Sequence, residues 1–473
     1  MSRESHTLLL VHDAQYIHGS IGIHEPFQQP DVTVEARVGQ KPDGTFLVGD
    51  ALGDAMASDA ELDVFYPIEN GVVRDWNSLE ALWHHVLVER LGVQPAENAY
   101  FVMLALPSPV SRDVYERGAQ LLFETFNTPA LTISEVPLLA AYAVGVLTAL
   151  VVDIGAEESS AVAVHDCIVV PTGIVVTKLG VVHCTYWLAH LLRQDAEIVR
   201  ALEPVAHGQL DAAAWALAQQ LVADKLVLVD RKSTQQVDED DGVLDVAQAL
   251  VDGRERMVVE AHEREKDAAA QHPHGGTGAA DSLTVTFRGA EVPVPYALRT
   301  RFHEPLLAPA LLERVTLSIP VPRAVQQALQ ARRLGGEPAC LSLVDTVARA
   351  VAQVHPQERR VALWESVVFT GAAAQVPGLP AELQRALSAL TTMELTEAAQ
   401  VVGEPNPAQP QAVRTQRIPD YFSAFKERLD LAPFLGATIY AKLVFGDLSG
   451  RNYITKKQYN EGGPAVAFAI GSV

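Results

Sequence analysis

Two stretches near the ends of the chain decide the fold: Tyr66-Pro-Ile-Glu-Asn-Gly-Val-Val-Arg-Asp-Trp76 and Tyr453-Ile-Thr-Lys-Lys-Gln-Tyr-Asn-Glu-Gly-Gly-Pro464. Leu82-Trp-His-His85 follows the first of them, and a third stretch, Phe123-Glu-Thr-Phe-Asn-Thr-Pro-Ala130, lies between them. These ordered mixtures of aromatic, charged and turn-forming residues are much more specific than the apolar runs around them. They therefore anchor the interpretation of the whole chain.

The composition is that of a large soluble globular protein. With 473 residues, 48% of them hydrophobic, the chain can bury a large core, and its length favours several structural units. The formal net charge of -22 argues against direct binding to nucleic acid, because phosphate contacts need clustered Lys and Arg. Three scattered cysteines, Cys167, Cys184 and Cys340, suit neither a disulfide framework nor a zinc site. We therefore expect a reducing intracellular compartment.

The longest apolar run, Val136 to Val152, is slightly short for a membrane span and has an acidic residue at each end. We interpret it as a buried helix with Ser134 as its N-cap, followed by a turn and a strand over Ala149 to Asp153. On this interpretation we predict no membrane partner.

Strand and helix patterns alternate through the chain. Two hairpins are predicted near the N-terminus, one from Leu8 to Val11 with Tyr16 to Ile23, and one from Val32 to Val38 with Thr45 to Val48 across the turn Lys41-Pro-Asp-Gly44. Further predicted strands cover residues 99–106, 131–133, 149–153, 160–164 and 167–170, and helices cover about 78–91, 112–126, 184–194 and 212–221. The hairpins after residues 8 and 149 each follow an apolar strand that ends in Asp, which indicates two related halves.

Together, the quoted stretches resemble actin and the actin-related proteins, and the resemblance covers nearly the whole chain. It implies an α/β, actin-like, two-lobed fold similar to that of sugar kinases and heat-shock ATPases, with duplicated ribonuclease-H-like domains. Lobe I would comprise residues 1–148 and 430–473, with a small outer subdomain at about 31–66. Lobe II would comprise residues 149–429, with an insertion at about 231–281.

The first segment that holds ATP phosphates in that family departs from the family pattern here. The pattern is an Asp followed by Gly, Ser and Gly, with a Lys a little later. This chain keeps Asp13 but has Gln15, Tyr16 and Ile17 at the small-residue positions, and Ser20 where the Lys is expected. Because backbone N–H groups approach phosphate closely only past small residues, a bulky loop cannot hold phosphate in the same way.

The second phosphate loop is also incomplete. Asp153 and Gly155 match the family, but Ala156 replaces the carboxylate that helps to order Mg²⁺ and water. Glu157 and Glu158 are conceivable substitute ligands, although two extra carboxylates repel a triphosphate unless a metal offsets them. We assign no metal.

The resemblance assigns the remaining nucleotide contacts as follows. The family's water-positioning Gln falls on Val136, which has no polar group to orient an attacking water. The adenine contacts match better, with Asp224 and Lys225 on a helix and Gly371 in a turn. We therefore expect no catalytic residues, and either no cofactor or ATP as a non-hydrolysed ligand, with cofactor-binding residues Asp13, Asp153, Gly155, Asp224, Lys225 and Gly371.

Other segments carry little chemistry. Residues 231–281, with the acidic run Asp238-Glu-Asp-Asp241, and the Pro-rich stretch Val402 to Pro419 are predicted to be surface insertions. They are either tolerated insertions or partner-binding appendages. His84-His85 and His272-Pro-His274 lack a third ligand at a suitable spacing, so we predict no metal site there.

The resemblance also sets expectations about partners. The long mobile loop that grips the next protomer in an actin filament is absent between Val34 and Asp50, so we expect no self-filament. Degenerate phosphate loops with retained terminal stretches are most like the fungal nuclear subclass found in SWI/SNF and RSC chromatin remodellers. The resemblance thus implies a non-catalytic nuclear subunit that pairs with a second actin-related protein and binds a helical segment N-terminal to the remodeller motor. Residues expected near that segment are Tyr142, Phe434 to Leu443 and Val376 to Leu379.

Two alternative functions stay open at this point. One is a cytoskeletal, actin-related subunit of dynactin, which would be cytoplasmic. The other is a divergent but active ATPase that uses Asp13, Asp153 and Glu157 in an altered arrangement.

Overall fold

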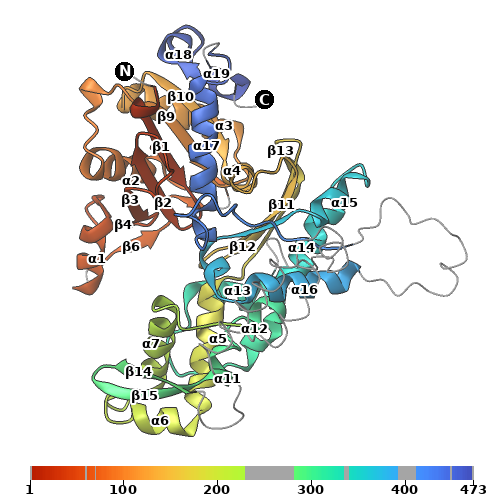
Figure 1. Ribbon diagram of the computed structural model, residues 1–473. Helices are drawn as coiled ribbons and strands as arrows, with labels where there is room; N and C mark the ends of the chain where they lie inside the picture. Colours follow the sequence, from red (N-terminus) through yellow and green to blue (C-terminus); the bar gives the residue numbers. More distant parts are fainter. Residues whose placement is uncertain are drawn as a thin grey trace, which may run out of the picture. The chain divides into compact units, whose positions relative to one another are not determined.

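The computed structural model describes residues 3–58, 61–69, 71–229, 282–334, 340–391, 412–447 and 450–470 (Figure 1). These residues fall into two compact units. Unit 1 comprises Met1–Val182, Arg323–Gln375 and Leu387–Val473, and unit 2 comprises His183–Pro322 and Val376–Ala386. The predicted lobe boundary at residue 148 is a different division and stays a prediction. The predicted insertion at 231–281, with its histidines, and most of the predicted loop from Val402 to Pro419 lie outside the described residues.

The first sheet of unit 1 has six strands in the order β17 (Ile454–Thr455), β10 (Ala130–Glu135), β9 (Phe101–Leu106), β1 (Thr7–His12), β2 (Tyr16–Ile21) and β3 (Val32–Glu35). β1 is parallel to β9 and antiparallel to β2, so the predicted N-terminal hairpin is confirmed. Leu8 and Leu10 belong to one buried cluster, and Leu9 and Val11 to another. The sheet is therefore buried on both faces, which explains the continuous apolar sequence of β1.

Two helices cover one face of this sheet. α2 (Trp76–His84) continues as a π-helical segment, η2 (His85–Arg90), and α3 (Arg112–Gln120) continues likewise as η4 (Leu121–Thr125). Asp75 caps α2 by accepting hydrogen bonds from the N–H groups of Asn77 and Ser78, and Ser111 caps α3. The helices predicted over 78–91 and 112–126 are thus confirmed, with their last turns wound more loosely than an α-helix.

Two of the quoted sequence stretches meet in the structure. β17 pairs with β10, so that Thr455 lies opposite Ala130, and α18 (Lys456–Gly462) follows directly. The ring of Tyr459 stacks on that of Phe123 with 4.6 Å between centroids, and its hydroxyl donates to Glu124 Oε1 at 2.7 Å. Lys456 Nζ donates to the carbonyl of Phe123 at 2.9 Å. The C-terminal stretch therefore packs directly against Phe123-Glu-Thr-Phe-Asn-Thr-Pro-Ala130.

A small outer sheet has the order β5 (Phe46–Val48), β4 (Val38–Gln40) and β6 (Asp63–Phe65), with α1 (Gly49–Ala57) beside it. The turn predicted at 41–44 is confirmed, because the N–H of Lys41 donates to the carbonyl of Thr45 at 2.9 Å. The single strand predicted over Val32 to Val38 is wrong. The N–H of Ala36 bonds to the carbonyl of Gln15, and the chain changes sheets there, so β3 and β4 are separate strands.

The second sheet of unit 1 has the order β13 (Ile168–Thr177), β12 (Ser159–His165), β11 (Ala149–Ile154) and β16 (Val367–Thr370). β11 is antiparallel to β12 and parallel to β16, just as β1 is antiparallel to β2 and parallel to β9. This repeated arrangement agrees with the two related halves predicted from the sequence. Helices α13 (Arg323–Leu334), α14 (Leu343–Ala352) and α15 (Arg359–Trp364) belong to the same unit.

The apolar run Val136 to Val152 forms α4 (Val136–Ala143), a turn and β11, as predicted. The N-cap is Glu135 and not Ser134, because Ser134 still belongs to β10, and Glu135 accepts a hydrogen bond from Ser108 instead of capping the helix. α4 packs against α17 (Ala432–Gly446), where a Cβ on Gly436 would collide with the carbonyl of Leu139. These two core helices lie side by side in Figure 1.

One described helix passes a test of length and composition for crossing a membrane. It runs over Leu429–Gly446 and consists of η9 (Leu429–Leu431) and α17. However, 61% of this stretch is buried within the structure, and Phe434, Leu435 and Phe445 belong to the core cluster around β1. We interpret it as a core helix.

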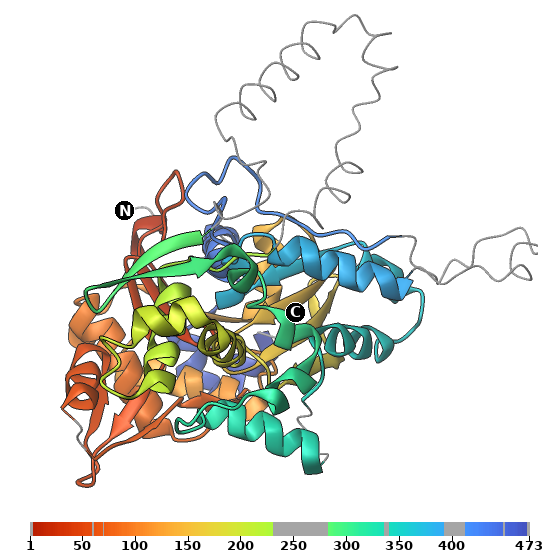
Figure 2. The ribbon, with the colours of Figure 1, turned by 90° about the horizontal axis from the view of Figure 1, so that it is seen from below.

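Unit 2 is mainly helical. It contains most of α5 (Val181–Gln194), then α6 (Ala196–Leu202), α7 (Leu210–Ala223), β14 (Ser282–Phe287), β15 (Ala290–Pro295), α11 (Tyr296–Arg299), α12 (Glu304–Leu307) and η6 (Pro309–Arg314). The antiparallel β14–β15 hairpin, green in Figure 2, lies beside the yellow-green helices α6 and α7, and Gln220 Nε2 donates to the carbonyl of Thr286. The helices predicted over 184–194 and 212–221 are confirmed.

Short elements complete the described chain. They are η1 (Glu4–His6), β7 (Ile68–Glu69), β8 (Val72–Val73), η3 (Pro95–Glu97), η7 (Ala372–Gln375), α16 (Leu379–Thr391) and α19 (Val466–Ile470). Cys167, Cys184 and Cys340 are not joined in disulfides.

Candidate functional site

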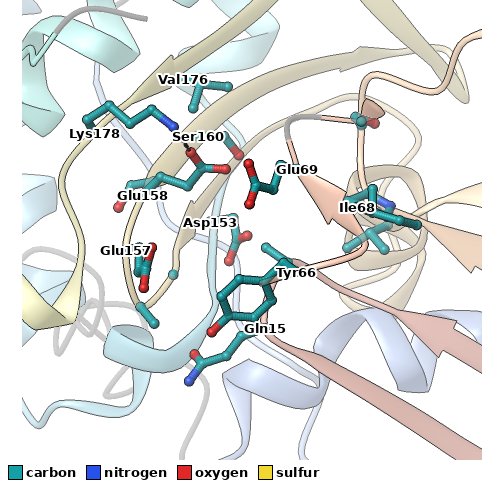
Figure 3. A pocket seen from close by; sticks show the side chains of 18 of the residues that line it. Gln15, Tyr66, Ile68, Glu69, Asp153, Glu157, Glu158, Ser160, Val176 and Lys178 are labelled. Carbon is teal, nitrogen blue, oxygen red and sulfur yellow. Dashed lines mark hydrogen bonds and ion pairs between the residues drawn. The ribbon is translucent and has the colours of Figure 1, made fainter. Parts of the chain in front are cut away.

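Unit 1 contains a cavity of ≈ 220 Å³ where the turns after β1 and β11 meet (Figure 3). This volume is below the roughly 300–1,000 Å³ of typical small-molecule sites. The outer sheet, the start of α4 and the start of α13 also line it. Residues that matter for its chemistry are Gln15, Arg37, Tyr66, Glu69, Val136, Asp153, Gly155, Ala156, Glu157, Glu158, Lys178 and Arg323.

The turn after β1 uses its own backbone N–H groups. Asp13 Oδ1 accepts hydrogen bonds from the N–H of Gln15 at 2.8 Å and from the N–H of Tyr16 at 2.6 Å. His18 Nε2 lies 3.2 Å from Asp13 Oδ2, and the N–H of Asp13 donates to the carbonyl of Tyr16. Burial alone would raise the pKa of Asp13, but these donors outweigh burial and lower it. The Asp13 carboxylate thus takes the donors that a phosphate-binding turn offers to its ligand.

The turn after β11 is closed in a similar way. The N–H of Gly155 donates to the carbonyl of Glu158 at 3.1 Å. At the start of α5, the N–H groups of Val181 and Val182 donate to the carbonyls of Gly155 and Ala156 at 3.0 and 2.9 Å. Because these helix N–H groups already have acceptors, they are not free to bind an anion.

Asp153 lies at the end of β11 and faces the cavity, with different surroundings from Asp13. Its carboxylate has no hydrogen-bond or ion-pair partner among the described residues. Gly371 allows it to lie there, because a Cβ on Gly371, whose φ is +87°, would collide with Asp153 Oδ1. Burial, followed by the negative charges of Asp13 and Glu158, raises the pKa of Asp153 to about 7.

Carboxylates dominate the rest of the lining, and Figure 3 shows Glu69, Glu157 and Glu158 around Asp153. Lys178 Nζ is already paired with Glu158 Oε2 at 2.7 Å. The pKa of Glu157 is raised, mainly by burial. A triphosphate entering this cavity would meet several negative charges, and like charges at short range are costly in a partly buried site.

The two basic side chains at the edge of the cavity offer little compensation. Arg37 Nε donates to Glu35 Oε2 at 2.7 Å, so this guanidinium already has a carboxylate partner. Arg323 is exposed at the start of α13. Neither residue was identified from the sequence, and nor were Tyr66, Glu69 and Lys178, because no local pattern links the outer sheet and β13 to the two turns.

Within unit 1, the structure brings several of the predicted nucleotide-site residues together. Asp153 and Gly155 line the cavity, and Gly371 contacts Asp153. Asp13 does not line it, but its carboxylate accepts a hydrogen bond from the N–H of Gln15 in the turn after β1. Val136, at the position of the family's water-orienting Gln, also lines the cavity. The other two predicted residues belong to unit 2, where Asp224 is the C-cap of α7 and Lys225 follows it.

The described residues contain no cluster of His, Cys, Asp and Glu that could hold a metal ion. His85 Nδ1 pairs with Glu89 Oε2 at 2.8 Å on its own helical segment, and His84 lies near the same carboxylate. His272 and His274 lie outside the described residues.

Comparisons with known proteins identify the family of this chain. The family model described as Actin matches residues 27–468. The chain is 22% identical to the "SWI/SNF and RSC complexes subunit arp9" of Schizosaccharomyces pombe, over 98% of both chains. It is 34% identical to "Actin-related protein 4" of Arabidopsis thaliana, over 25% of this chain and 26% of the relative.

These matches confirm the α/β, actin-like fold and the predicted likeness to the fungal remodeller subclass. The match of the family model extends over most of the chain, from before the outer sheet to the C-terminal helices. This protein is a member of the actin family.

Proposed function

We propose that this chain is a non-catalytic, actin-related structural subunit of a nuclear chromatin-remodelling complex of the SWI/SNF or RSC type. Its similarity to the S. pombe subunit, which extends over 98% of both chains, supports membership in such a complex. The net charge of -22 is compatible with a role in which other subunits contact DNA.

The hydrogen bonding of the turn after β1 is the observation that carries the non-catalytic part of this proposal. Phosphoryl transfer depends on donors and cations positioned around the phosphates. Here the N–H groups of Gln15 and Tyr16 point to Asp13, while Ala156 and Val136 supply neither a metal ligand nor a group to orient water. In this proposal ATP is at most a static ligand.

The second part of the proposal concerns an exposed group of apolar side chains on unit 1. Leu147 and Ile168 are both 59% exposed and Leu443 is 66% exposed, whereas most large apolar side chains are buried. The ring of Tyr142 stacks on that of Tyr440 at 5.8 Å, one helical turn before Leu443, and the side chain of Cys167 lies beside Tyr142. The N–H of Cys167, next to Ile168, donates to the carbonyl of Leu147. We call Tyr142, Leu147, Ile168, Tyr440 and Leu443 the apolar patch.

In this proposal the apolar patch receives the helical segment N-terminal to the remodeller motor, and a second actin-related protein pairs with the chain on the same segment. An amphipathic helix binds by laying its apolar face against such a surface, which needs no nucleotide hydrolysis. Among the residues expected near that segment, Phe434 and Leu379 are buried, whereas Leu443 is exposed and Tyr142 and Tyr440 are half-buried.

Affinity purification of the tagged chain from cells that express it, followed by mass spectrometry, tests complex membership. We expect a remodeller ATPase and a second actin-related protein among the recovered partners. Recovery of dynein-activator components without any remodeller ATPase would replace this proposal with the cytoskeletal alternative.

The double substitution Ile168→Asp and Leu443→Asp tests the apolar patch. Charges within an apolar interface are costly, so we expect recovery of the remodeller ATPase to fall by about 10-fold or more. Val72→Asp is the matched control, because Val72 is also 66% exposed but lies on β8. Equal losses in the control and the double variant would argue against the patch, and far-ultraviolet circular dichroism would verify folding.

A further inference from the structure

The base of the cavity holds an ionisable group, Asp153, that forms no ion pair with any described residue. Asp153 lies opposite Ser160 of β12 and Thr370 of β16 in the second sheet. The Thr370 hydroxyl donates to the carbonyl of Leu429 at 2.9 Å, not to Asp153. Gly371, the next residue, offers no side chain. No hydrogen bond to the Asp153 carboxylate is formed within the described part of these strands and this turn.

The charged groups that face Asp153 from neighbouring elements are mostly negative. Asp13 lies in the turn after β1. The N–H groups of Gln15 and Tyr16, together with His18, contact the Asp13 carboxylate and not that of Asp153. Glu158 lies in the turn after β11 and holds Lys178, the cation that follows β13. The other charged groups around the cavity are Glu157, Glu69 from β7, Arg37 beside β4 and Arg323 from α13.

A partly buried carboxylate without a donor is more stable with a proton than without one. Loss of water around the ionised form is costly, and a second carboxylate nearby adds to that cost. Burial and the charges of Asp13 and Glu158 act in the same direction here and raise the pKa of Asp153 to about 7. Asp13 differs, because its hydrogen bonds favour the ionised form.

We propose that protonation of Asp153 stabilises the base of this cavity by removing a negative charge beside Glu158, so that ionisation of Asp153 loosens the turn from Asp153 to Glu158. The neutral carboxylic acid keeps this turn closed when the pH is below neutral. The inference concerns unit 1 alone and does not depend on the proposed partners.

The direction of the pH dependence follows from the two states of the chain. In the unfolded chain Asp153 titrates near its ordinary value of about 4. In the folded chain it titrates near 7, so between these values the folded state binds more protons than the unfolded state. Stability from this residue is therefore greatest at low pH, and it is lost as the pH rises from about 4 to about 7.

Asp153→Asn tests the inference, because an amide keeps the shape and cannot ionise. The midpoint of thermal unfolding is measured without nucleotide and with a chelator at about pH 5.5 and about pH 8, on either side of the folded-state titration. At the higher pH we expect the variant to unfold at a higher temperature than the wild type, and the variant to be less sensitive to pH. Asp420→Asn is the control, because that carboxylate is 82% exposed and pairs with Lys426 at 2.9 Å on the surface.

A local measurement keeps the test independent of global unfolding. The N–H of Gly155 donates to the carbonyl of Glu158, so its hydrogen exchange reports whether the turn is closed. After correction for the intrinsic pH effect, exchange should be faster at pH 8 than at pH 5.5 in the wild type and should change little in Asp153→Asn. An unchanged wild-type rate, or an equal increase in the variant, would overturn the proposal.

Discussion

The turn after β1 and the turn after β11 each follow a buried strand that ends in an aspartate, but the two carboxylates have opposite surroundings. Asp13 accepts two backbone hydrogen bonds and lies beside His18, which lowers its pKa. Asp153 has no donor among the described residues, and its burial, followed by the nearby carboxylates, raises its pKa. Related positions in a duplicated fold thus differ in charge because of their neighbours, and the residue type alone does not predict which form is present.

The largest expected effect comes from removing the acceptor of the first turn. Asp13→Ala leaves the N–H groups of Gln15 and Tyr16 without their partner in a largely buried turn, so we expect a loss of about 3 kcal/mol in the free energy of unfolding. Urea denaturation measures it. Asp13→Asn, which keeps one oxygen acceptor, should lose less than half as much, and equal losses in the two variants would contradict the assigned hydrogen bonds.

Gly371→Ala probes the close approach of Asp153 to the neighbouring turn. A Cβ there would collide with Asp153 Oδ1 and the backbone of Ile154, and φ is +87°. We expect a loss of about 2 kcal/mol in unfolding free energy.

Gly44→Ala is a matched control for this substitution. Gly44 has the same φ of +87°, but a Cβ there would have nothing within 4 Å. The control should therefore lose only the conformational part, about 1 kcal/mol. Equal losses would mean that Asp153 does not pack against Gly371 in solution.

The contrast between the two aspartates also predicts opposite pH responses. The pKa of Asp13 is depressed in the folded state, so its stabilising contribution is complete above its ordinary value of about 4 and is lost as the pH falls below that value. Asp13→Asn should flatten the acid side of the stability profile by about 1 kcal/mol. Denaturation between about pH 3 and about pH 5.5 measures this slope. An unchanged slope in the variant would contradict the opposite pH responses expected for the two aspartates.

The smallest effect is expected at the edge of the cavity. Lys178 and Glu158 form a pair whose side chains are 23% and 26% exposed, and such pairs contribute about 0–1 kcal/mol. Lys178→Met should therefore change the unfolding free energy by less than about 1 kcal/mol at moderate ionic strength. A much larger loss in chemical denaturation would indicate that Lys178 offsets the charge of the whole carboxylate group.

The general architecture could be predicted because it depends on local patterns and specific stretches. Apolar runs that end in Asp marked β1 and β11, and the C-terminal stretch indicated the family because its Tyr459 and Lys456 fit residues 123–130 directly. By contrast, the division of Val32 to Val38 between two sheets and the N-cap at Glu135 depend on contacts with Gln15 and Ser108. Because Gln15 and Ser108 lie elsewhere in the sequence, local patterns could not reveal these contacts.

The site was predicted less completely. Bulky residues after Asp13 and Ala156 after Gly155 indicated altered phosphate loops. They did not reveal that Asp13 itself accepts the turn's N–H groups, or that the Asp153 carboxylate forms no hydrogen bond with the described residues. Those properties arise from the three-dimensional arrangement of the turns, with side chains such as Glu69 and Lys178 contributed from elsewhere in unit 1.

The central claim is that the cavity between these two turns cannot split a nucleotide. Magnesium-dependent phosphate release from ATP by the purified chain and by Asp153→Ala tests it most directly. The account predicts equal release from both proteins at the level of a no-enzyme blank. Release by the wild type well above that level, abolished in Asp153→Ala, would contradict it.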